Sequence, residues 1–170
     1  EEMHRKSRVE QVSEMINRNS DMVYRLAFSM VKSVQDAEDV HQEVFIRYIR
    51  TNPLFESREH ERAWFIRVTT NLCKNLWKSA WRQKMVSMDS LEETQEGNAY
   101  VQQSLNEEEE LLVETVKRLP FKYRVVVHLF YYEEMSLEEI AQALNLKSSN
   151  VRTRLTRARK MLREWLKEDV

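Results

Sequence analysis

The stretch "SLEEIAQALNLKSSNVRTRLTRARKML", residues 136–162, decides the fold of the C-terminal part of this chain. Ser136 and Glu139 match a capping box, in which the hydroxyl accepts from an N–H of the first helical turn and the carboxylate accepts from the N–H of the cap. Asn145, which tolerates left-handed backbone, stands where the chain must reverse, and Ser148 can cap a second helix. The stretch therefore predicts two helices joined by a tight turn, a helix-turn-helix.

The second helix of this unit separates an apolar face from a cationic face. Its apolar residues fall on one arc of a helical wheel: Val151, Leu155, Ala158, Leu162, Trp165 and Leu166. Residues 147–163 hold seven Lys or Arg and no acidic residue. A solvated basic face is the simplest explanation of such charge. The capped helix, the tight turn and the basic second helix together favour DNA recognition instead, with polar residues near the helix N-terminus reaching bases and cations holding phosphates.

The composition indicates a helical protein without catalytic or metal-binding groups. The chain of 170 residues has 1 Gly and 2 Pro, with 42% hydrophobic and 32% charged residues, which favours helices joined by short polar links. Cys73 is the only cysteine, and the four histidines lack metal-ligand spacing. No apolar run is long enough to span a membrane. We expect an all-α, soluble, cytoplasmic protein that is not an enzyme and binds no metal or cofactor.

Charge is segregated along the chain into three blocks, although the net charge is only -1. Residues 62–84 hold six basic residues and no acid, and residues 86–116 hold nine acids and no base. Residues 85–106 lack helical periodicity and contain the only glycine, so they are predicted to be an acidic, flexible linker. The linker would join two small helical domains, residues 1–84 and 107–170.

A long helix is predicted over residues 62–84, because this stretch contains no helix breaker. One face would carry the apolar residues Phe65, Val68, Leu72 and Leu76, and another Arg67, Asn71, Lys74 and Lys78. Trp64 and Trp81 lie near its margins. Taken alone, these tryptophans are more often core residues, but cations interleaved with aromatic rings suit single-stranded DNA.

Two further regions are predicted to be helical. Residues 36–50 would turn Ala37, Val40, Val44 and Tyr48 inward, leaving an acidic face that is either solvated or a docking surface for a protein. Residues 107–119 and the segment from Pro120 to Glu134 would precede the helix-turn-helix, because proline suits the first turn of a helix. The C-terminal domain is thus predicted to have four helices.

Taken together, these stretches resemble a bacterial RNA polymerase sigma factor of the extracytoplasmic-function group of the sigma-70 family. The resemblance covers nearly the whole chain, through "YRLAFSMVKSVQDAEDVHQEVFIRYIR" (24–50), "ERAWFIRVTTNLCKNLWKSAWRQK" (61–84) and "LPFKYRVVVHLFYYEEMSLEEIAQALNLKSSNVRTRLTRARKML" (119–162). It implies a sigma2-like helical bundle, a sigma4-like domain with the helix-turn-helix, and a factor that directs polymerase to promoters and promotes DNA melting.

The resemblance also implies roles for individual residues. The RNA polymerase-binding positions are Glu38, Asp39, Gln42, Glu43 and Phe45. The loop Thr51–His60 stands where the family captures a flipped base, and the minus-ten DNA-binding positions are Arg58, Arg67, Asn71, Lys74 and Lys78. The minus-thirty-five DNA-binding positions are Ser149, Asn150, Arg152, Thr153, Thr156 and Arg157.

The implied partners are core RNA polymerase, promoter DNA and an anti-sigma factor. In polymerase the contacts would be the clamp helices of the largest subunit and the flap of the second-largest subunit. Two other functions remain open from the residues alone. One is a helix-turn-helix regulator that binds a palindromic duplex without polymerase, and the other is a module whose basic helices bind an acidic protein.

Overall fold

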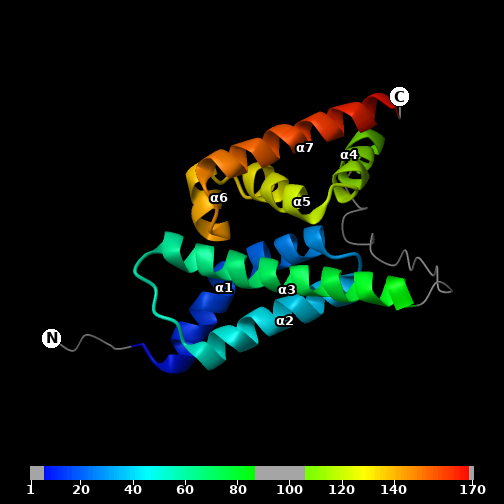
Figure 1. Ribbon diagram of the computed structural model, residues 1–170. Coiled ribbons are helices and arrows are strands. Elements are labelled where there is room, and N and C mark those ends of the chain that lie inside the picture. Colours follow the sequence, from blue (N-terminus) through cyan, green and yellow to red (C-terminus); the bar gives the residue numbers. More distant parts are fainter. Residues whose placement is uncertain (1–5, 87–105, 169–170) are drawn as a thin grey trace.

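The structure is a computed structural model that describes residues 6–86 and 106–168, with side chains described outside 80–86. Within these ranges the chain forms helices and no strand, which confirms the all-α prediction (Figure 1). The N-terminal bundle consists of α1 (Arg8–Met30), α2 (Val34–Thr51) and α3 (Arg58–Val86). The C-terminal domain consists of α4 (Glu107–Lys117), α5 (Phe121–Val127), the π-helical turn η1 (His128–Tyr132), α6 (Leu137–Leu144) and α7 (Ser148–Glu168).

Short polar side chains fix where the helices of the N-terminal bundle begin and end. The hydroxyl of Ser7 accepts from the N–H of Glu10 at the start of α1, and Ser33 caps α2 in the same way. Helix α2 ends at Asn52, whose φ of 45° is left-handed. Helix α1 was not among the elements expected from the sequence. It packs against both α2 and α3 and completes the bundle.

The predicted helix-turn-helix is confirmed. The capping box of Ser136 and Glu139 is present at the start of α6, and Asn145 has a left-handed φ of 55°. The N–H of Leu146 donates to the carbonyl of Ala141 at 2.8 Å, so the turn closes on the end of α6. Helix α7 already begins at Ser148, the residue expected to precede it as a cap. The π-helical turn η1 has no counterpart in the sequence analysis.

The apolar face expected for α3 is only partly right. Phe65 is fully buried, but Leu76 is 36% exposed, whereas Ile66 and Cys73 are completely buried. The difference arises because α3 packs against α1, α2 and α6 instead of against one neighbour. Such a central helix must be apolar on more than one face.

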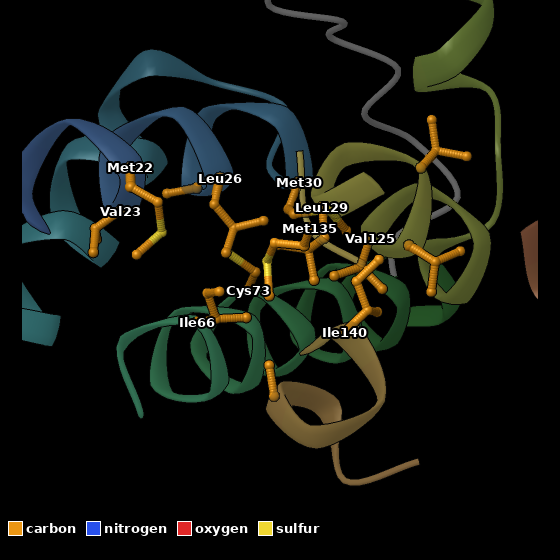
Figure 2. Packing of buried hydrophobic residues seen from close by; sticks show 14 of the residues in the cluster. Met22, Val23, Leu26, Met30, Ile66, Cys73, Val125, Leu129, Met135 and Ile140 are labelled. Atoms are coloured by element: carbon orange, nitrogen blue, oxygen red, sulfur yellow. The ribbon is translucent and has the colours of Figure 1, made fainter. Parts of the chain in front are cut away.

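The two halves of the chain share one hydrophobic core. Helix α6, orange in Figure 1, contacts α3, and α5 contacts α1. The buried residues form a single cluster that runs from α1 and α3 into η1 and α6 (Figure 2). The sequence predicted two domains held apart by a linker, and the structure brings them into contact. The predicted linker 85–106 lies almost entirely outside the described residues.

The helices were also searched for a membrane-spanning segment and for groups of metal-ligating side chains. No helix in the described ranges is long and apolar enough to cross a membrane. Among the same residues, no three His, Cys, Asp or Glu side chains are grouped as a metal site would require.

Candidate nucleic-acid interface

The first half of α7 presents a polar, cationic face to solvent. All six residues predicted to read duplex DNA are exposed there: Ser149, Asn150, Arg152, Thr153, Thr156 and Arg157. On the opposite side Val151, Leu155 and Ala158 are buried against the rest of the domain. The buried face therefore fixes the rotation of α7 about its axis and aims the polar face outward.

Hydrogen bonds within α7 orient part of this polar face. The hydroxyl of Thr153 donates to the carbonyl of Ser149 at 2.9 Å, so its oxygen keeps its acceptor capacity. The side-chain oxygen of Asn150 accepts from Arg154 Nε at 3.0 Å, which turns the amide N–H₂ of Asn150 away as a donor. Donors and acceptors of this kind can read base edges in a major groove.

A second cationic face follows α3. Arg67, Asn71, Lys74 and Lys78 are all exposed and recur at a spacing of three or four residues, so they form one row about 16 Å long. Arg58 is exposed at the first residue of α3, about 13 Å along the helix from Arg67. The row can follow several phosphates of one strand.

Arg67 differs from the others in this row, because its guanidinium is bound by the C-terminal domain. It donates from Nη2 to the carbonyl of Gln142 at 3.1 Å and from Nε to the carbonyl of Ala143 at 3.2 Å. These carbonyls belong to the last turn of α6, where the helix dipole is negative.

A groove with a cavity volume of about 990 Å³ lies between α3 and the C-terminal domain. Its apolar residues come from both halves and include Val31, Leu76, Trp77, Phe121 and Leu146. Six cationic residues and one acid also line it: Lys32, Arg67, Lys74, Lys78, Lys122, Arg154 and Asp36. The groove therefore favours anionic occupants.

Helix α2 carries the acidic face that was predicted to bind polymerase. Glu38, Asp39 and Gln42 are exposed, and Glu43 is half-buried and accepts from Arg47 at 3.3 Å. Phe45 does not belong to this surface. Its side chain is 7% exposed and packs on Phe65, with ring centroids 5.4 Å apart, because it continues the inward face of α2.

The loop between α2 and α3 is held from inside by aromatic residues. Phe55 is half-buried, stacks on Tyr48 at 6.5 Å between centroids and meets Trp64 edge-on at 5.9 Å. Trp64 is half-buried in the same cluster, so the core interpretation holds for it, while the side chain of Trp81 lies outside the described ones. Leu54 projects from this anchored loop with 89% of its surface exposed.

Four residues form a contact between the two halves that sequence reasoning missed; we call it the Glu133 clasp. The Glu133 carboxylate accepts from Arg25 Nε and Nη2, both at 3.0 Å, and lies 3.2 Å from Nε2 of His128. Arg62 Nη2 donates to the backbone carbonyl of Glu133 at 2.8 Å. Arg25 on α1 lies 108 positions from Glu133 and Arg62 on α3 lies 71 positions from it, so no local pattern could have indicated the contact.

The clasp changes the acidity of Glu133. Burial opposes ionisation of this carboxyl, but hydrogen bonds from His128 and Arg25 and their charges outweigh burial and lower its pKa from 4.5 to about 2. A carboxyl with a lowered pKa stabilises the folded state fully above its unfolded pKa, and that contribution is lost as the pH falls from about 4.5 towards 2.

We therefore expect Glu133→Gln to be less stable than wild type at pH 7 by about 3 kcal/mol, with the gap closing below pH 4.5. Urea unfolding between pH 7 and pH 3 measures both the difference in the free energy of unfolding and its dependence on pH. Glu134→Gln is the matched control, because the neighbouring side chain is exposed. A gap that stays constant with pH would show that the ionised carboxylate is not what stabilises the clasp.

Two family models match separate parts of the chain. Residues 15–83 match the family Sigma-70 region 2, and residues 109–162 match the family Sigma-70, region 4. These segments correspond to the N-terminal bundle and to most of the C-terminal domain.

Two curated relatives span most of the chain. The ECF RNA polymerase sigma factor SigW of Bacillus subtilis is 29% identical over 98% of this chain and 99% of its own length. The RNA polymerase sigma-E factor of Streptomyces coelicolor is 31% identical over 90% of this chain and 84% of its own length.

A solved structure shares the fold at low sequence identity. The sigma factor RpoE of Bartonella quintana, crystallised with the anti-sigma factor NepR, is similar with a TM-score of 0.76 and 19% identity, over 93% of this chain and 98% of that one.

Proposed function

Because the chain belongs to the extracytoplasmic-function group of sigma-70 family RNA polymerase sigma factors, we propose that it reads two separate promoter elements and opens the DNA at one of them. The family consists of factors for promoter-directed transcription initiation. One observation carries the finer proposal: each half of the chain has an exposed cationic helical face, on α3 and on α7. Residues 62–84 of α3 and residues 147–163, which carry the α7 face, contain no acidic residue.

In this proposal α7 enters the major groove of the minus-thirty-five element. Arg152 and Arg157 hold phosphates, and Asn150 and Thr153 approach base edges near the helix N-terminus. Phosphate contacts position the helix on the duplex without specifying sequence. Sequence preference therefore comes from the amide and hydroxyl groups.

The N-terminal bundle acts at the minus-ten element. A base leaves the stack and is held at the loop Thr51–His60, which repays an unpairing cost of about a few kcal/mol. Leu54 projects from this loop, and the row Arg67, Asn71, Lys74 and Lys78 holds the displaced strand. Duplex binding by α7 raises the effective concentration of the bundle at this site.

Protein partners complete the proposal. The exposed residues Glu38, Asp39 and Gln42 of α2 are proposed to meet the clamp helices of the largest polymerase subunit, with Glu43 beside them. The C-terminal domain is proposed to meet the flap of the second-largest subunit. An anti-sigma protein is a proposed further partner, since the similar RpoE was crystallised with one.

Run-off transcription tests the function. Core RNA polymerase with this protein, given a fragmented library of its own genome, is expected to yield a discrete set of start sites that the core alone does not yield. An electrophoretic shift of those promoter fragments should require the core enzyme. Specific binding to a palindromic duplex by the protein alone would instead identify a helix-turn-helix regulator, and no promoter protection with core present would favour a protein-binding module.

A further inference from the structure

Asn150 lies in the part of α7 proposed to approach base edges, but half of its amide group is already bound. It is the third residue of α7 and is exposed. Its side-chain oxygen Oδ1 accepts a hydrogen bond from Arg154 Nε at 3.0 Å. A guanidinium carries donors only, so the amide atom that faces Arg154 must be the oxygen. The N–H₂ group of Asn150 is therefore the part of the amide that is left for a base.

Arg154 is well placed to hold Asn150 in this orientation. It lies four residues further along α7, where two side chains of a helix meet, and it was not among the residues predicted to read DNA. Its side chain is half-buried and lines the groove beside α3 together with Leu144 and Leu146. A half-buried side chain has fewer rotamers open to it, so the bond to Asn150 costs less side-chain entropy.

This bond decides which base edge Asn150 can bind. In a major groove, asparagine identifies adenine through two hydrogen bonds: its oxygen accepts from the N6 amino group and its N–H₂ donates to N7. Here the oxygen is already bonded to a cation, and adenine would have to displace a charge-assisted hydrogen bond to reach it. Guanine offers two acceptors, N7 and O6, and needs only the donor. Asn150 held by Arg154 should therefore favour guanine over adenine.

Thr153 has the opposite polarity on the same exposed face. Its hydroxyl donates to the carbonyl of Ser149 at 2.9 Å, so its oxygen can only accept from a base. Such an acceptor matches the amino groups of adenine and cytosine. Three helical residues rise about 4.5 Å and one base pair about 3.4 Å, so Asn150 and Thr153 reach neighbouring base pairs. The bond of Thr153 does not involve Arg154, which makes the Thr153 base pair an internal control.

We propose that Arg154 is a positioning residue that determines specificity: by binding Oδ1 of Asn150, it makes Asn150 select guanine over adenine at one base pair of the minus-thirty-five element. The inference rests on the proposed function, because it concerns the duplex that α7 reads. Arg154 acts through Asn150 and touches no base itself. Its loss should change which sequence is bound, and not only how tightly the duplex is held.

The test uses the holoenzyme, core RNA polymerase with the full-length chain, and duplex fragments of the promoters found by run-off transcription. Asn150→Ala and Thr153→Val first identify the base pair that each side chain reads, as the position where preference among the four bases disappears. The four versions of each base pair are then bound in competition by wild type, Arg154→Met, Arg154→Lys and Arg163→Met. Methionine keeps an unbranched apolar stem without a donor, and lysine keeps a cation with donors only. Arg163→Met removes the same charge from an exposed position further along α7.

Wild type is expected to bind guanine about tenfold more tightly than adenine at the Asn150 base pair. Arg154→Met should lower this ratio to about one or less, because the released oxygen of Asn150 can then accept from adenine N6. It should leave the preference at the Thr153 base pair unchanged. Arg154→Lys and Arg163→Met should keep the wild-type ratio of guanine to adenine.

A wild-type preference for adenine at the Asn150 base pair would overturn the inference, whether or not Arg154→Met folds. An unchanged ratio in Arg154→Met would also overturn it, as would an equal loss in Arg163→Met or an Asn150→Ala variant that keeps every base preference. Failure of the proposed function would look different, because the wild-type holoenzyme would then bind promoter fragments no more tightly than unrelated duplex.

Discussion

Arg152→Glu/Arg157→Glu is expected to lower promoter-specific run-off transcription about 100-fold or more. Both side chains are exposed on the outward face of α7, so substitution leaves the buried face of the helix untouched. A charge-assisted hydrogen bond contributes about 1.5 to 3 kcal/mol, and the loss of two already exceeds the 2.7 kcal/mol that corresponds to 100-fold. Repulsion between the new carboxylates and the phosphates adds to this loss.

Two measurements separate this effect from a change in net charge. Arg163→Glu/Lys167→Glu makes the same charge change on exposed positions further along α7 and is expected to retain most activity. The salt dependence of promoter binding by the holoenzyme should fall by about two in log-log slope for the first variant only. Equal loss in both variants would mean that the N-terminal part of α7 does not contact the duplex.

Lys74→Glu/Lys78→Glu is expected to reduce promoter opening about 100-fold while polymerase binding stays unchanged. These lysines lie four residues apart in the α3 row, where the displaced single strand is proposed to run. Carboxylates there would repel the strand that the bundle must hold to keep the base pairs open. The fluorescence of 2-aminopurine placed in the minus-ten region reports opening, and competition for core enzyme reports polymerase binding.

The matched control is Asn75→Glu/Ser79→Glu, which places two carboxylates one residue further round the same helix on exposed positions. It is expected to open promoters within a few-fold of wild type. If Lys74→Glu/Lys78→Glu opened promoters as well as this control does, the α3 row would not hold the displaced strand.

Local signals explain which parts of the fold could be predicted. The capping box at Ser136 and the left-handed turn at Asn145 depend on groups a few residues apart, and both are present. The exposed positions of α7 followed from its apolar arc, because Val151 and Leu155 are buried as expected. Helical periodicity likewise placed Ala37 and Val40 inward on α2.

Contacts between distant segments could not be predicted in this way. Leu76 was expected to be apolar core, but the burial of α3 depends on three different neighbours. Phe45 was expected on the polymerase-binding face, although its spacing from Val44 and Tyr48 is equally consistent with the inward face that it occupies. The contacts of Glu133 with Arg25 and Arg62 and the bonds of Arg67 to α6 join residues 71 to 108 positions apart, for which a single sequence carries no periodic signal.

The apolar contact between α3 and the C-terminal domain makes the interaction of the two halves depend on temperature. Separating the halves would hydrate buried aliphatic groups, which raises the heat capacity. The hydrophobic contribution to the contact between the halves therefore weakens on cooling.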